Sequence, residues 1–207
     1  MKPISLLLPV CLLGLFADCK KETIDLNKWI EENQQERVVN LSKKEIAYLP
    51  KEISKLQKVE ELTLQYDSLV AIPEELGELK QLKILNLYGN PIQSLPSSLA
   101  NLQNLEVLLL GRTKLERVPT FFRELKELKT LALDETKIQL TEEDVEILAS
   151  IKSLERLDLT LLRSYQSLPK NIGKLSFLKE ISFQKIPFEK ADVKRLRDEL
   201  PGVRVKL

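Results

Sequence analysis

A leucine pattern that returns every 23 residues constrains this chain more than any other feature. The second leucine of a central Leu-x-Leu segment stands at Leu41, Leu64, Leu87, Leu110 and Leu133. The next two steps are 26 and 24 residues, to Leu159 and Phe183, and a last apolar segment is centred on Val205. A fixed period of about 20–50 residues is typical of solenoids, in which each repeat is one structural unit. The spacing therefore predicts seven stacked repeats and a terminal half-repeat.

The clearest repeat, residues 82–96, predicts the structure of one unit. Its Leu-Lys-Ile-Leu-Asn-Leu segment alternates with period two, which predicts a strand with inward leucines and outward residues between them. A Leu-Pro-x-x-Leu segment follows, and its proline fixes φ where a short helical segment begins. The equivalent prolines are Pro50, Pro73, Pro96, Pro119 and Pro169. We therefore expect an α/β solenoid whose concave parallel sheet has seven or eight short strands, with short helical or 3-10 segments on the convex side.

The two ends of the solenoid have their own sequence patterns. Leu26–Glu32 has helical apolar spacing, which predicts a cap with Trp29 over the first end of the core. Glu189–Leu200 predicts a second cap helix with Val193, Leu196 and Leu200 on one face. Pro201-Gly202 then ends this helix before a closing strand.

The fifth repeat departs from the pattern. Thr141 is followed by Glu142, Glu143 and Asp144, which is typical of a helix N-cap with acids in the first turn. We expect a true helix from Glu142 to Ser150. The template asparagine, Asn90, is replaced elsewhere, and its equivalents are Lys44, Asp67, Thr113, Thr136, Leu162 and Ile186. Thr and Asp can partly take over its hydrogen bonds to the turn, whereas Leu and Ile cannot.

The first residues predict export. An apolar run from Ile4 to Phe16 follows Lys2 and is too short to span a bilayer, which indicates a signal peptide over residues 1–18. Cys19 directly follows this region and resembles the acylated cysteine of bacterial lipoproteins, although Asp18 departs from the usual small neutral residue. Ordinary secretion is the alternative. The expected domains are then a linker and cap helix over 19–37, repeats over 38–188 and a C-terminal cap over 189–207.

Residues 38–207 resemble the typical 23-residue leucine-rich-repeat family, as in the Leu-Pro-Lys-Glu-Ile-Ser-Lys-Leu segment at 49–56. With its leader, the chain is similar to exported leucine-rich-repeat lipoproteins of double-membraned bacteria. The resemblance implies protein binding on the concave sheet, sometimes to host proteins, with no fixed partner. Because a fold does not determine function, the function must be inferred from the residues on the concave face.

The composition argues against several functional classes. The sequence has no histidine, which removes Ser-His-Asp and Cys-His catalysis and the commonest metal ligand. It has no glycine-rich phosphate-binding motif, so we expect no enzyme, cofactor or metal. The acids at Glu142, Glu143 and Asp144 could act as a pair, but helix N-terminal acids explain them better. Lys and Arg total 32 against 31 for Asp and Glu, which argues against nucleic acid as a partner.

The outward residues of the strands predict the binding face. An apolar and aromatic centre lies beside charges of both signs, a pattern typical of interaction sites. The alternative is that Val, Ile and Tyr simply suit strands. The predicted ligand-binding residues are Tyr66, Ile84, Asn86, Tyr88, Val107, Leu109, Arg112, Asp134, Arg156 and Asp158.

The expected size of the sheet limits what it can hold. Eight strands about 4.8 Å apart make a face about 34 Å wide, with about 480 Å² of projected area. This is less than the roughly 800 Å² per partner of a standard interface, so an extended segment or a helix fits better than a folded domain. Small-molecule substrates are not expected, because their sites are enclosed.

These features lead to one functional hypothesis with two alternatives. We expect a monomeric, exported protein, anchored to the outer membrane or cell surface through Cys19, or otherwise periplasmic or secreted. Its concave sheet would bind a protein or peptide ligand, for example in host interaction or adhesion. The alternatives are a periplasmic or envelope scaffold and an intracellular effector.

Overall fold

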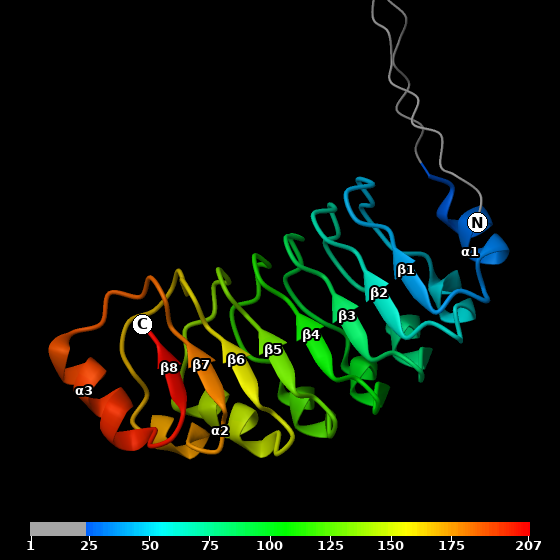
Figure 1. The fold of residues 1–207 in the computed structure, drawn as a ribbon. Coiled ribbons are helices and arrows are strands. Elements are labelled where there is room, and N and C mark those ends of the chain that lie inside the picture. The colour runs from blue at the N-terminus through cyan, green and yellow to red at the C-terminus, as the bar shows by residue number, and fades with distance from the viewer. Residues whose placement is uncertain (1–23) are drawn as a thin grey trace, which may run out of the picture.

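The computed structural model describes residues 24–207, so the predicted signal peptide and the candidate lipidation residue Cys19 lie outside the described residues. Eight short strands form one parallel sheet, and they follow one another in chain order across it (Figure 1). They are β1 (Val38–Asn40), β2 (Glu61–Thr63), β3 (Ile84–Asn86), β4 (Val107–Leu109), β5 (Thr130–Ala132), β6 (Arg156–Asp158), β7 (Glu180–Ser182) and β8 (Arg204–Lys206). The predicted solenoid is confirmed.

The strands pair in the register that the repeat alignment predicts. One row of paired residues runs through Val38, Glu61, Ile84, Val107, Thr130, Arg156, Glu180 and Arg204. The lengthened steps after Leu133 do not break this row, because the extra residues lie outside the strands. Each concave side chain therefore has its repeat equivalents as its neighbours.

The convex side is built mostly from 3-10 turns. These are η1 (Lys51–Lys55), η2 (Glu74–Glu78), η3 (Ser97–Asn101), η4 (Thr120–Glu124) and η5 (Ile172–Leu175). The residues before the first four are the predicted prolines Pro50, Pro73, Pro96 and Pro119. The fifth differs, because Asn171 precedes η5 and Pro169 lies two residues earlier. Between residues 24 and 207, none of the helices has the length and apolar character needed to span a bilayer.

The inward leucines form one apolar core that continues from Ile30 to Leu200. Asn90 is fully buried within it, where its Nδ2 donates to the carbonyls of Leu64 (2.6 Å) and Leu87 (2.9 Å). Its Oδ1 accepts the backbone N–H of Leu69 at 3.1 Å. One side chain thus ties the turns of two neighbouring repeats together.

The polar replacements Thr113, Thr136 and Asp67 take over part of the hydrogen bonding of this asparagine. The hydroxyls of Thr113 and Thr136 each donate to a carbonyl three residues earlier at 2.8 Å. Asp67 Oδ1 accepts the N–H groups of Lys44 (2.8 Å) and Ile46 (3.2 Å). Leu162 cannot make such bonds, and at its turn the N–H of Arg163 donates to the carbonyl of Thr136 at 3.2 Å.

Helices cap both ends of the core (Figure 1). Helix α1 (Leu26–Glu32) begins after Asp25, whose side chain accepts the N–H of Lys28. Trp29 packs against the core as predicted, but only partly, and the adjacent Ile30 is the fully buried residue. Helix α3 (Lys190–Glu199) is one residue shorter at each end than predicted. Leu196 and Leu200 are buried, while Val193, predicted on the same face, is only half-buried.

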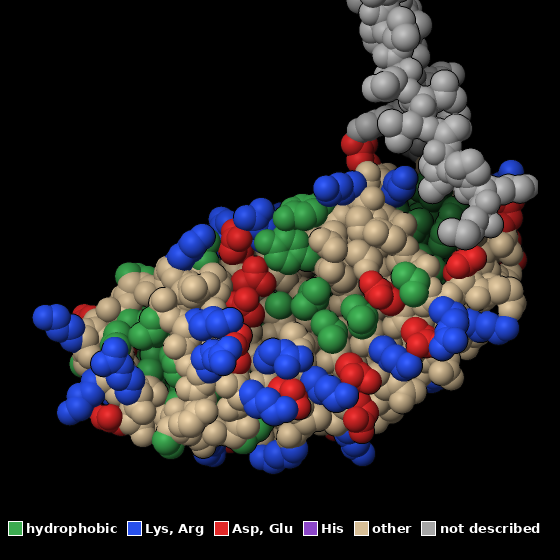
Figure 2. Space-filling model, viewed as in Figure 1, with side chains coloured by type: hydrophobic (Ala, Val, Ile, Leu, Met, Phe, Trp, Pro, Cys, Tyr) green, Lys and Arg blue, Asp and Glu red, His purple; other side chains and the backbone are tan. Residues whose placement is uncertain are grey.

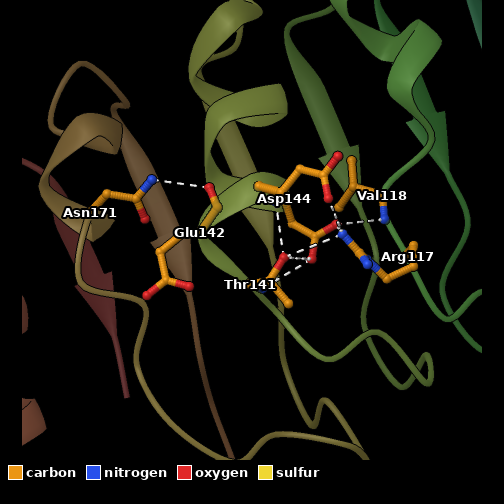
Figure 3. A network of polar contacts seen from close by, with 7 residues as sticks. Arg117, Val118, Thr141, Glu142, Asp144 and Asn171 are labelled. Carbon is orange, nitrogen blue, oxygen red and sulfur yellow. Dashed lines mark hydrogen bonds and ion pairs between the residues drawn. The ribbon is translucent and has the colours of Figure 1, made fainter.

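Helix α2 (Glu142–Ser150) replaces a 3-10 turn in the fifth repeat, as predicted. Thr141 is its N-cap, and the carboxylate of Asp144 is fully buried below it. Asp144 Oδ2 accepts from the backbone N–H (2.9 Å) and the hydroxyl (2.7 Å) of Thr141. Its Oδ1 accepts the N–H of Val118 at 3.1 Å and lies 3.4 Å from Arg117 Nε, both in the preceding repeat (Figure 3). These contacts give the carboxylate a structural role.

Candidate functional site

The apolar centre predicted on the sheet lies on its concave face. Ile84, Val107 and Leu109 come from β3 and β4, and all three side chains are half-buried. Ile84 pairs with Val107, and Leu109 pairs with Asn86 on one side and Ala132 on the other. Figure 2 shows hydrophobic side chains gathered over the middle strands, with charged side chains around them. These side chains therefore keep part of their surface exposed on the concave face.

Asn86 differs from the prediction, because only 8% of it is exposed. Strands about 4.8 Å apart bring neighbouring side chains together, so a short residue is covered by longer ones beside it. Its Oδ1 accepts the N–H of Tyr88 at 3.1 Å, and Asp158 makes the same contact with Thr160 at 2.9 Å. Asn86 therefore orients the backbone that carries Tyr88 and offers little surface to a ligand.

A left-handed turn places the next residues at the rim of the face. The residues at this position all have φ between 51° and 75°, a region that is unfavourable for side chains other than glycine. They are Lys43, Tyr66, Gly89, Arg112, Glu135, Leu161 and Lys185. The repeat alignment groups them in one column, but only Gly89 signals the conformation. Because the chain turns here, the Tyr66 and Arg112 side chains project beside the sheet.

Two tyrosines pack against each other at this rim. The rings of Tyr66 and Tyr88 are 5.3 Å apart at 72°, an edge-to-face arrangement. Lys43 lies 5.8 Å from the centre of the first ring, and Arg112 lies 5.8 Å from the centre of the second. Burial, helped by the nearby charge of Asp134, raises the pKa of Tyr88 to about 12. The Tyr88 hydroxyl thus stays neutral at physiological pH.

Gly111 is a site residue that the sequence reasoning missed. A Cβ there would stand 2.7 Å from Tyr88 Cε2 and 2.3 Å from Asp134 Oδ1. The tyrosine ring and the carboxylate therefore meet over the glycine, within about 5 Å of each other. The φ of Gly111 is not in the left-handed region, so the backbone conformation does not require a glycine here. The glycine matters because its missing side chain leaves space for the tyrosine ring and the carboxylate. The column alignment contained this signal, since Gly111 separates Tyr88 from Asp134 in register.

The charges beside the tyrosines divide into two groups. Arg112 Nε lies 2.8 Å from Glu135, and Arg163 lies 3.2 Å from the same carboxylate. The guanidinium of Arg112 holds the pKa of Glu135 below its usual range. By contrast, Asp134 and Asp158 form no ion pair within residues 24–207. Arg163 was missed because it lies in the lengthened sixth repeat, outside the aligned columns.

Arg156 lies away from the tyrosines, at the beginning of β6. Its Nε donates to the Thr130 hydroxyl at 3.1 Å, and it pairs with Glu155 at 3.4 Å. It borders a row of alternating charges that the sequence reasoning also missed, Arg37, Glu60, Lys83, Glu106, Lys129, Glu155 and Lys179. Ion pairs join Glu60 to its neighbours on both sides and join the last four residues in two pairs. The charges of this row, which precedes the strands, are therefore paired with one another.

The site has the chemistry of a contact surface. Among residues 24–207, no three His, Cys, Asp or Glu side chains are grouped so that they could hold a metal ion. The tyrosines, Leu109 and the free carboxylates instead offer apolar, aromatic and anionic contacts side by side, which suit binding to a polypeptide.

Residues 73–201, more than half of the chain, match the family model of the leucine-rich repeat region. The chain belongs to the leucine-rich-repeat family. Members of this family commonly mediate protein–protein interaction, and they are generally non-enzymatic modules. No curated protein matches the sequence closely enough to be counted as a relative.

Solved leucine-rich-repeat structures resemble this one. A protein of Leptospira interrogans is 31% identical, with a TM-score of 0.64 over 80% of this chain and 41% of its own. The ectodomain of the Arabidopsis thaliana receptor kinase GASSHO1/SCHENGEN3, solved in complex with CASPARIAN STRIP INTEGRITY FACTOR 2, is 26% identical, with a TM-score of 0.61 over 86% of this chain and 22% of its own. The ectodomain of the Arabidopsis thaliana receptor kinase SOBIR1, at 24% identity and a TM-score of 0.50 over 63% of this chain and 72% of its own, shares the fold. This leucine-rich-repeat chain thus spans less than half of the length of the Leptospira protein.

Proposed function

We propose that this leucine-rich-repeat protein binds a protein or peptide segment on its concave sheet and catalyses no reaction. The observation that carries the proposal is the partly exposed patch of Ile84, Val107, Leu109 and Tyr88 in the middle of the face. Apolar and aromatic side chains that stay partly exposed next to charged ones are characteristic of interaction surfaces. The complex of the plant ectodomain with its factor supports a ligand of this class.

The dimensions of the sheet support a segment over a folded domain. Each strand has three residues, and eight strands about 4.8 Å apart span about 34 Å. An extended peptide that crosses the strands needs about ten residues to cover this width at about 3.3 Å per residue. A globular partner of standard interface size would also have to contact the rims.

The double substitution Tyr88→Ala with Leu109→Asp is expected to abolish peptide capture. It removes the aromatic anchor and puts a charge in the apolar centre, changes that typically cost more than about 2 kcal/mol at a hot spot. The test uses peptides selected on the wild-type protein from a phage-displayed random library. The expected loss in affinity is more than about tenfold. The protein should stay folded, as circular dichroism can check, because both side chains lie on the concave face and outside the leucine core.

Two further variants complete this test. Gly111→Ala should also weaken capture, because the new methyl group displaces the Tyr88 ring and the Asp134 carboxylate without straining the backbone. Tyr48→Ala with Val70→Asp is the matched control, since these exposed apolar residues lie outside the concave sheet. Equal capture by the Tyr88 and Leu109 double variant and the wild type would place the site on the convex side or the loops.

We also propose that the protein is exported and anchored to a membrane through an acylated Cys19. The apolar run from Ile4 to Phe16 followed by this cysteine supports the proposal, and similar structures include receptor ectodomains. Cells fed radiolabelled fatty acid should label the wild-type protein and leave Cys19→Ala unlabelled. An unlabelled wild type that is still processed at the leader would instead indicate ordinary secretion.

A further inference from the structure

Two carboxylates on the concave face, Asp134 and Asp158, form no ion pair within the described residues 24–207. Of the cations near the two tyrosines, Arg112 and Arg163 are both bound to Glu135, and Lys43, three repeats before Arg112, lies over the ring of Tyr66. Asp134 and Asp158 face the same side of the sheet from neighbouring repeats and have no ion-pair partner within residues 24–207. A half-buried carboxylate beside a second one is costly unless a cation approaches both.

These carboxylates adjoin the apolar centre. Asp134 Oδ1 and the Tyr88 ring are within about 5 Å of each other above Gly111. Asp158 pairs in register with Ala132, and Ala132 pairs with Leu109. An aromatic ring, an aliphatic side chain and two carboxylates thus come from four consecutive repeats, β3 to β6, which span three strand spacings, roughly 14 Å.

We propose that the bound segment places a lysine or arginine side chain on Asp134 and Asp158 and an apolar side chain on Leu109 and Tyr88. The proposal rests on the proposed function and specifies the chemistry of its ligand. The carboxylates supply charge complementarity, and the Tyr88 ring can pack against the aliphatic stem of the basic side chain. An acidic ligand would meet uncompensated like charge at the same place.

The geometry also predicts the spacing of the two ligand residues. In an extended segment, side chains on the same side are two residues apart, or roughly 6.6 Å. The step from Leu109 to the carboxylates is one to two strand spacings, roughly 5–10 Å, and a lysine or arginine stem can bridge the difference. The basic residue is therefore expected two positions from the apolar one.

Short peptides selected from the random phage-displayed library on the full chain, and then synthesised, provide the test. Replacing the basic residue of a selected peptide with norleucine, which keeps the stem without the charge, should weaken wild-type binding at least about tenfold. For the variant Asp134→Asn with Asp158→Asn, the two peptides should bind within about twofold of each other. The amide that replaces the Asp158 carboxylate keeps an oxygen for the N–H of Thr160, so the fold is retained.

A matched control changes the same net charge elsewhere. Glu116→Gln with Asp198→Asn alters two exposed acids outside the sheet and should leave the preference for the basic peptide intact. If the control loses the preference as well, the effect comes from overall charge and the proposal is wrong.

The outcomes separate the inference from the proposed function. Selected peptides that lack a basic residue but lose binding to Leu109→Asp would overturn the inference and leave the concave site standing. Peptides that bind Leu109→Asp as well as the wild type, or a selection with no enriched peptide, would overturn both. Enriched peptides with a basic residue whose contribution disappears in the double asparagine variant support both.

Discussion

Replacing Asp144 with alanine is expected to lower the free energy of unfolding by about 3–5 kcal/mol. The carboxylate is fully buried and accepts from Thr141 and from the Val118 N–H. The substitution leaves the N–H groups of Val118 and Thr141 without acceptors, which removes the side-chain half of the capping box of α2, while the backbone N–H of residue 144 still donates to the Thr141 hydroxyl. It also removes the ion pair to Arg117, but this contributes little because the Arg117 side chain is about half exposed. Urea unfolding should show a lower midpoint with an unchanged slope.

Two substitutions check the cause of this loss. Asp144→Asn keeps one acceptor oxygen and should cost less than alanine, about half as much. Glu143→Gln changes an exposed neighbour that contacts Arg117 alone and should alter stability by less than about 0.5 kcal/mol. A loss below about 1 kcal/mol for Asp144→Ala would mean that water or a rearranged turn replaces the carboxylate.

Asp134→Asn is expected to stabilise the protein at neutral pH by about 1–3 kcal/mol. Burial, and then the charge of Asp158, raises the pKa of Asp134 from 3.8 to about 6, while Glu135 adds to the rise and Arg112 opposes it. Because each pKa unit corresponds to about 1.4 kcal/mol, the charged side chain costs up to about 3 kcal/mol, and its partial exposure reduces this figure. Asparagine has the same shape without the charge.

The pH dependence of this difference is the sharper measurement. With a raised pKa in the folded state, Asp134 binds its proton more tightly when folded, so its contribution to wild-type stability falls as pH rises from about 4 to about 6. The stability difference between the variant and the wild type should be small below about pH 4 and constant above about pH 6. Unfolding in urea at these pH values tests it, with Asp198→Asn as the exposed control. A difference that does not change with pH would mean that the charge of Asp134 is not its source.

The two substitutions separate an acid with a structural role, Asp144, from an acid of the proposed binding surface, Asp134. Both carboxylate oxygens of Asp144 accept hydrogen bonds from the protein itself, so removing them should lower the free energy of unfolding. Asp134 has no ion-pair partner within residues 24–207. Replacing its carboxylate should raise the free energy of unfolding and weaken the proposed capture of a basic segment. A loss of stability at Asp134 in exchange for binding would fit the proposed function, since residues of binding surfaces commonly reduce the stability of the fold.

The repeat period determined most of the architecture. A residue's neighbours in a solenoid are its equivalents one period away, so the alignment of Val38, Glu61 and Ile84 already contained the strand register. Local signals determined the irregular parts as well, since Thr141 and the acids after it define the start of α2 through contacts a few residues apart. The columns also placed Tyr88, Leu109 and Asp134 on one face.

The tertiary structure decided which of these neighbouring side chains are buried and which form ion pairs. Asn86 is covered, Gly111 admits the Tyr88 ring and Arg112 turns to Glu135, and each outcome depends on side-chain directions that a column alignment does not contain. Arg163, which lies outside the aligned columns, forms an ion pair with Glu135. Asp144 accepts a hydrogen bond from the N–H of Val118 in the preceding repeat. Periodicity specifies which backbone positions are adjacent, whereas burial and ion pairing depend on the size and reach of the side chains packed there.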